Sequence, residues 1–144
     1  MGDINTVSNV YWSLRKFIYE MLPSVTAVYT PNQQAAPDVN SWIAIQGLDT
    51  PKLDRITVTN YRIHCVVRNN ADDIPMQDLT TQIINTFEST TSTKMILVYD
   101  KQTSVMVGRM YVTDIKSRPS IPYESGITVR PIDITLRYLA NRHA

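Results

Sequence analysis

The sequence predicts an α+β fold with a mostly antiparallel or mixed sheet, two helices packed on one face, and a long projecting strand or hairpin. Three patterns indicate this class. Apolar residues recur with a helical period in residues 3–22 and 75–88, they alternate over residues 55–68, and further alternating segments follow residue 94. Because 144 residues can bury a core without disulfides or metals, we expect a single domain over residues 1–144.

The first 54 residues are predicted to form a helix and two strands. The helix covers residues 3–22 and ends at Pro23, which cannot continue it. A short strand at 24–30 leads into a loop at 31–41, and a second strand at 42–47 precedes a turn at 48–54. Alternation gives the second strand two faces, with Trp42, Ala44 and Gln46 on one and Ile43 and Ile45 on the other.

Residues 55–68 are predicted to form an unusually long strand. The apolar positions change phase between Val58 and Tyr61, which would turn half of the strand over. We therefore expect a bulge near Thr59 or Asn60. We also expect residues 61–67 to belong to the sheet, while the half before the bulge bends away toward a neighbouring subunit.

A polar turn and a second helix follow the long strand. Pro75 suits the first turn of a helix, and Asp73 is the expected cap. The helix at 75–88 is predicted to bury a stripe of four apolar side chains, Met76, Leu79, Ile83 and Phe87.

The last third of the chain is predicted to be a meander of three strands. The nearly continuous apolar run at 94–99 predicts a central strand covered on both faces. After a turn at 100–103, a strand at 104–116 should kink at Gly108. The segment 117–126 is expected to be a loop, because its two prolines argue against ladder pairing. A final strand at 127–139 changes phase around Pro131, which indicates an edge or a bulge.

The sequence contains no recognisable catalytic motif. His64 lies on the polar phase of the long strand beside Arg62, and Cys65 lies on the apolar phase, which favours a solvated or interfacial histidine and a buried hydrophobic cysteine. One cysteine and two distant histidines do not supply a zinc site, and the four glycines form no phosphate-binding pattern. We expect no catalytic residue, no cofactor and no metal.

Charge and hydropathy limit the partners. Residues 1–100 carry seven Lys and Arg against ten Asp and Glu, whereas residues 101–144 carry seven against three. This asymmetry indicates either complementary faces on neighbouring copies or a solvated surface without a special role. A nucleic-acid surface would be more basic. No apolar run is long enough to span a bilayer, and we expect no signal peptide and no membrane contact.

The order of elements resembles the tail-terminator, or tail-completion, proteins of long-tailed bacteriophages. The resemblance rests on the N-terminal amphipathic helix, the segments Trp-Ile-Ala-Ile-Gln46 and Tyr-Arg-Ile-His-Cys-Val-Val67, the helix that begins at a proline, and the terminal Ile-Asp-Ile-Thr-Leu-Arg-Tyr138. It extends over nearly the whole chain as a similarity of pattern.

The resemblance implies a virion protein of the tail and neck, assembled in the host cytoplasm. Such a protein forms a homo-oligomeric ring, a hexamer in this family, that caps the head-proximal end of the tail tube and ends its polymerisation. The implied partners are the tail tube protein, the head-completion or connector protein and the tape-measure protein. DNA passes through the lumen without sequence-specific binding.

The resemblance directs attention to surfaces. We expect partner contacts in the loops 30–41 and 117–126, and subunit or lumen contacts on the long strand. The residues we select are Pro31, Pro37, Arg118, Pro119 and Tyr123 in the loops and Arg62, His64 and Arg68 on the strand. An ordinary exposed position remains the alternative for each. A head-closure connector, a baseplate component or a secretion-system tube cap is the alternative function, and a small enzyme is a more remote one.

Overall fold

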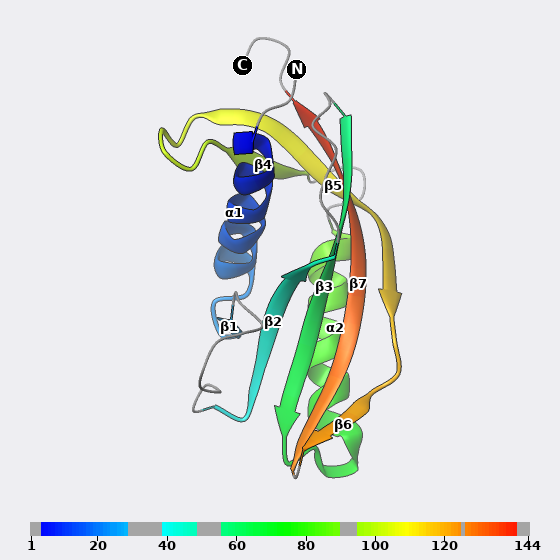
Figure 1. The fold of residues 1–144 in the computed structure, drawn as a ribbon. Helices are drawn as coiled ribbons and strands as arrows, with labels where there is room; N and C mark the ends of the chain where they lie inside the picture. The colour runs from blue at the N-terminus through cyan, green and yellow to red at the C-terminus, as the bar shows by residue number, and fades with distance from the viewer. Residues whose placement is uncertain (1–3, 29–38, 49–55, 90–94, 125, 141–144) are drawn as a thin grey trace.

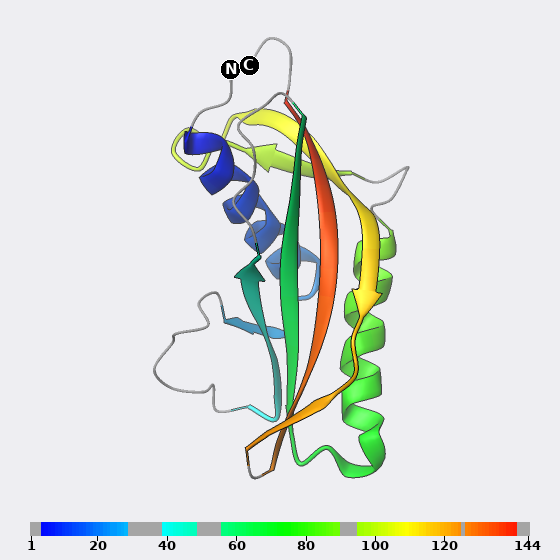
Figure 2. The same cartoon turned by 45° about the vertical axis from the view of Figure 1, so that its right-hand side comes forward.

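The computed structural model describes residues 4–28, 39–48, 56–89, 95–124 and 126–140. Figures 1 and 2 show a curled sheet with both helices on the same side of it. The helical elements are α1 (Ile4–Met21), a short 3-10 turn η1 (Ala71–Asp73) and α2 (Ile74–Glu88). The strands are β1 (Thr26–Val28), β2 (Ser41–Gly47), β3 (Ile56–Arg68), β4 (Ile96–Tyr99), β5 (Met106–Ser117), β6 (Ile121–Glu124) and β7 (Ile127–Ala140).

The seven strands form one sheet in the order β1-β2-β3-β7-β5-β4, with β6 paired to β7 off this path. Only β1 and β2 run parallel among these pairs; every other neighbouring pair is antiparallel. This confirms the predicted α+β class and the mostly antiparallel, mixed sheet.

A single core fills the space between the sheet and the helices. Val10, Leu14 and Ile18 of α1 pack into the same buried cluster as the predicted stripe of α2, so both helices cover one face, as expected. The rings of Phe17 and Phe87, one from each helix, lie 5.8 Å apart between centroids. Burial of these side chains on a shared apolar sheet face therefore fixes both helices.

The predicted bulge in the long strand is wrong. β3 pairs with β7 without interruption from Ile56 opposite Leu139 to Arg68 opposite Ile127. Thr59 is buried in phase with Tyr61, whereas the side chain of Val58 is 53% exposed. The change of apolar phase thus marks a threonine on the core side and a valine on the outer side of a continuous strand.

The strand also does not bend away from the sheet. Residues 56–60 extend past β2, which pairs only with residues 61–67, but they remain paired with β7. The prediction that this half leaves for a neighbouring subunit is therefore wrong.

The phase change in β7 has the same explanation. Ile127 and Val129 pack on the outer side with Trp42 and Val66, whereas Ile132 and the apolar residues after it enter the main core. Pro131 lies in a central strand, opposite His64 of β3. The Pro131 carbonyl accepts a hydrogen bond from the Arg118 amide, on the side of β7 that faces away from β3. The N–H that proline lacks would point to that same side, where β5 has ended and β6 has not yet begun.

The kink predicted at Gly108 is confirmed as a register shift. Val98 pairs with Gly108, and Tyr99 pairs with Met106, which leaves one extra residue on β5. A Cβ at Gly108 would lie 2.5 Å from the Tyr138 ring and 2.6 Å from the Leu139 carbonyl oxygen. Glycine is required there because the neighbouring strand approaches so closely.

The strand predicted at the centre of the sheet, 94–99, is instead an edge strand. β4 pairs only with β5 among the described strands, and the side chain of Leu97 is 41% exposed. α1 covers its outer edge: the Tyr99 amide donates to Ser13 Oγ at 2.9 Å, and the Lys101 amide donates to Asn9 Oδ1 at 3.1 Å. The apolar run reflects contact with α1 on one side only.

Two local predictions in loops are also corrected. Residues 121–124, expected to be a loop, form β6 and pair with β7 despite Pro122, because an edge strand tolerates a proline. Asp73 occupies the cap position of α2 without capping through its side chain. Asn70 Oδ1 accepts the Met76 amide at 3.0 Å, while Asp73 accepts from Asn70 and Gln77. The predicted loop over 31–38 and most of the turn at 48–54 lie outside the described residues.

Candidate functional site: the bare face of the sheet

The candidate site is the side of the sheet turned away from α1 and α2, which we call the bare face. Among the described residues no helix covers this side (Figure 2). Partners across the ladders point to the same side, and so the register places Gln46, Arg62, Asp133 and Lys116 in one row across β2, β3, β7 and β5. The row holds one polar side chain and then three charged side chains of alternating sign on neighbouring strands.

An ion triad lies at the centre of this row. Arg62 donates to both carboxylate oxygens of Asp133, at 2.7 Å from Nε and 3.1 Å from the terminal nitrogen. Arg118 Nε donates to the second oxygen at 2.6 Å. The side chain of Asp133 is only 15% exposed, whereas that of Arg118 is 44% exposed. One carboxylate thus holds two guanidinium groups, and the triad keeps a net positive charge.

The electrostatics of the triad fix its protonation state. Hydrogen bonds from Arg62, and then from Arg118, lower the pKa of Asp133 to about 2, against the opposing effect of burial. The carboxylate is therefore ionised throughout the physiological range.

His64 lies on the same face, two residues along β3 from Arg62. Its Nε2 is hydrogen-bonded to Gln46 Oε1 at 2.8 Å. Burial, and then the positive charge of Arg62, lower the pKa of His64 below its ordinary value, although Asp133 acts in the opposite direction. The imidazole is accordingly neutral at pH 7, which suits a half-buried position in a sheet better than a charged contact.

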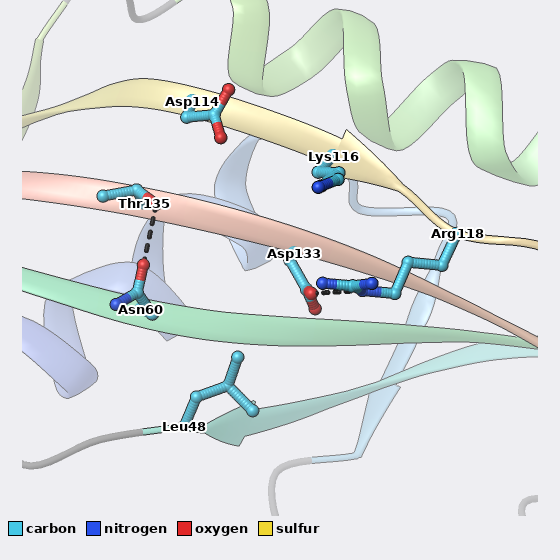
Figure 3. Close-up of a pocket in the computed structure, with 7 residues that line it drawn as sticks. All are labelled: Leu48, Asn60, Asp114, Lys116, Arg118, Asp133 and Thr135. Carbon is cyan, nitrogen blue, oxygen red and sulfur yellow. Dashed lines mark hydrogen bonds and ion pairs between the residues drawn. The ribbon is translucent and has the colours of Figure 1, made fainter.

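A pocket of about 340 Å³ opens beside the triad. Figure 3 shows the residues that line it: Leu48, Asn60, Asp114, Lys116, Arg118, Asp133 and Thr135. Thr135 Oγ1 donates to Asn60 Oδ1 at 2.7 Å, so the floor is tied together across β3 and β7. With charges of both signs on its rim, the pocket can receive a polar side chain of a partner.

The bare face becomes apolar toward the β6 end. Trp42 and Val66 are buried there in a second small cluster, and the Arg68 guanidinium lies 5.1 Å from the Trp42 ring centroid. Beyond this cluster Ile121 is 56% exposed and Tyr123 is 72% exposed. These neighbouring apolar side chains give the β6 end the character of a contact surface.

The structure brings together three of the residues selected from the sequence. Arg62, His64 and Arg118 lie around Asp133 and Gln46, whereas Arg68, Pro119 and Tyr123 lie toward the β6 end. Pro31 and Pro37 lie outside the described residues.

Sequence reasoning missed Asp133, which organises the triad, and Gln46, which holds His64. Their positions on the polar phases of two strands were visible. The register that sets them opposite Arg62 was the missing information.

Elsewhere the described residues offer little for chemistry. Burial raises the pKa of the Cys65 thiol to about 12, so this cysteine is unreactive in the folded state. The described residues contain no cluster of three or more His, Cys, Asp or Glu side chains that could hold a metal ion. Neither described helix combines the length and apolarity needed to cross a membrane.

Comparisons with known proteins extend only to the fold. No protein-family model matches the chain, and no curated protein matches its sequence. Eight chains of solved structures match it in fold. One of them, whose name carries no functional description, is 9% identical, with a TM-score of 0.59 and 93% of each chain covered. This similarity supports the α+β fold over nearly the full length.

Proposed function

We propose that this chain is a structural virion protein that forms a ring on the head-proximal end of a phage tail tube. The ring ends tube polymerisation and joins the tail to the head connector. Its partners are other copies of the chain, the tail tube protein, the connector protein and the tape-measure protein. DNA passes through its lumen without sequence-specific contacts. Its place is the neck of the virion, after assembly in the host cytoplasm.

The observation that carries the proposal is the one-sided architecture. A protein with helices on only one side of its sheet presents a broad strand surface to partners, and here that surface is polar, charged and internally braced by the Arg62–Asp133–Arg118 triad. A rigid surface of this kind binds with little loss of side-chain freedom. Closed rings need two different patches on each subunit, and the bare face and the helical side are two such patches.

The assembly state tests the ring. Native mass spectrometry and negative-stain imaging of the purified chain are expected to reveal six-fold rings of about 98 kDa, six times the 16.4 kDa subunit. A chain that is monomeric at every concentration, and stays so when tail tubes are added, would contradict the proposal.

A pair of tyrosines tests the contact at the β6 end. Tyr123 is 72% exposed beside the apolar end of the bare face, and Tyr19 on α1 is 73% exposed. We expect Tyr123→Ser to lower the fraction of tubes that carry a cap, because it removes an aromatic contact. Tyr19→Ser, matched in exposure, should leave that fraction unchanged. Equal effects of the two substitutions would show that the β6 end has no special role.

A further inference from the structure

Among the described residues, opposite charges gather on the bare face and on α2 with the turn before it. On the bare face the strand register places six basic side chains against two acidic ones, Asp114 and Asp133. The basic ones are Arg62, Arg68, Arg109, Lys116, Arg118 and Arg137. On the helical side, the segment 71–88 contains four acidic residues and no lysine or arginine. The bare face and the segment 71–88 therefore carry opposite net charges, whereas α1, on the same side as α2, carries Arg15, Lys16 and Glu20.

The acidic segment presents its charge outward. Met76, Leu79, Ile83 and Phe87 face the core, so the helical period directs Ile74, Asp78 and Asn85 away from it. Asp72, Asp78 and Glu88 are all exposed, and the side chain of Ile74 is 59% exposed. We call the exposed residues Asp72, Ile74, Asp78, Asn85 and Glu88 the outer ridge of α2. This ridge combines carboxylates with one apolar side chain.

The bare face offers matching groups. Arg109 and Lys116 are exposed on β5, and Val58 supplies an exposed apolar side chain on β3. Arg137 is half-buried between them, and its Nε is buried without an acceptor among the described residues. A carboxylate brought to this face would pair with Arg109 or Lys116, whose side chains are exposed.

The two surfaces also match in length and direction. From Asp73 to Glu88 the helix rises about 22 Å, at 1.5 Å per residue. From Arg109 to Lys116 the strand extends about 20 Å at 3.3 Å per residue, because a register shift leaves these residues opposite the six steps from Leu139 to Asp133 on β7. α2 runs alongside β3, β7 and the second half of β5 in the subunit, whereas the first half of β5 crosses over toward α1 (Figures 1 and 2). A second helix laid on the bare face in the same direction would therefore meet the basic groups along its whole length.

We infer that the outer ridge of α2 in one copy docks on the bare face of the next copy. This contact rests on the proposed ring, for which it supplies the subunit interface. The contact is head-to-tail, because the two surfaces differ. An open row of subunits therefore keeps one α2 ridge and one bare face unpaired until the assembly closes. Nucleic acid is the other polyanion that a basic face could bind, but the acidic ridge of similar length is present on the chain itself.

Charge reversal of each surface tests the contact. The ridge variant carries Asp78→Lys and Asn85→Lys, and the face variant carries Arg109→Glu and Lys116→Glu; all four positions are exposed. We expect each variant alone to dissociate, with an apparent dissociation constant raised about tenfold or more by like-charge repulsion. Lys101→Glu, at an exposed position in the β4–β5 turn, is the control and should assemble as the wild type does.

Mixing the two variants is the decisive step. In the mixture, the new lysines on the ridge variant can pair with the new glutamates on the face variant. The unaltered ridge of the face variant can likewise pair with the unaltered bare face of the ridge variant. We expect the equimolar mixture to recover assemblies in which the two variants alternate in a 1:1 ratio, measured by native mass spectrometry with one variant labelled with ¹⁵N. Circular dichroism of each variant checks that it is folded.

The outcomes separate the two proposals. Wild-type rings that persist in both variants would overturn this interface and leave the ring standing. Variants that dissociate but do not recover on mixing would overturn it too. Loss of duplex DNA binding in the face variant, with assembly intact, would assign the bare face to nucleic acid instead. A wild-type chain that forms no assembly, alone or with tail tubes, and no carbodiimide cross-link between labelled and unlabelled copies, would overturn both proposals.

Discussion

At the scale of single residues, Asp133 is the side chain on which the bare face depends. It receives both guanidinium groups of the triad and anchors three strand segments, since Arg62 lies on β3 and Arg118 follows β5. An aspartate between two arginines on a solvent-facing sheet fixes the positions of the charged side chains and does not serve to change their protonation.

Asp133→Asn should destabilise the fold by about 1–2 kcal/mol at pH 7, because the charge-assisted hydrogen bonds from two arginines weaken in a partly exposed site. The pKa of Asp133 is lower in the folded chain than its ordinary value of 3.8. Its contribution is therefore fully present above pH 3.8 and is lost as the pH falls toward about 2. Urea unfolding of both proteins over this range measures the difference. A difference that stays constant down to pH 2 would contradict this assignment.

His64 should make the fold less stable in mild acid. Its pKa is lower in the folded chain than its ordinary value of 6.5, so the unfolded chain binds the proton first as the pH drops. We expect the free energy of unfolding to decrease below pH 6.5 in the wild type and to decrease less in His64→Gln. Titration of the imidazole by NMR provides the independent check, and a pKa at or above 6.5 would refute the explanation.

The sequence indicated some of these residues but not their arrangement. Arg62, His64 and Arg118 could be selected as polar residues on a strand or in a loop. The partner of Arg62 lies 71 positions away in the chain. A separation of that kind becomes contact only through strand order and register, which the alternation of apolar residues does not specify.

At the scale of elements, both wrong bulge predictions came from one assumption, that a sheet has a single apolar face. β3 and β7 each carry apolar side chains on both sides, in the main core and in the small Trp42–Val66 cluster. A change of apolar phase along such a strand marks a change of which side is covered. The helices were predictable, because α1 and α2 each have one apolar stripe and stop at clear signals.

The edge strand β4 depends on two side chains of α1. Ser13 and Asn9 are buried, and each accepts a backbone amide of β4 or of the turn that follows it. They thereby satisfy part of an edge that would otherwise be open to pairing with another chain.

Ser13→Ala should cost about 1–2 kcal/mol, because it leaves the Tyr99 amide without its acceptor in a buried site. The same substitution should speed hydrogen exchange at that amide. Ser24→Ala, at an exposed position after α1, is the control and is expected to change stability by less than about 0.5 kcal/mol. Unchanged exchange at Tyr99 would show that Ser13 does not protect the edge.

At the scale of the whole molecule, the placement of charge differs from what the order of residues suggests. The two parts of the sequence differ in net charge, but the sheet interleaves them, and in the fold the contrast lies between α2 and the bare face. Complementary faces on neighbouring copies were one of two explanations that the sequence left open, and the register shows which residues share the basic face.

A ring of the kind we propose should stop the growth of a tail tube. The most direct measurement is the length distribution of tubes polymerised from the tail tube protein of the same virion, with and without the chain, by negative-stain microscopy. We expect added chain to arrest growth and to leave a ring at one end of each tube. Tubes that grow to the same lengths with and without the chain, and carry no ring, would contradict it.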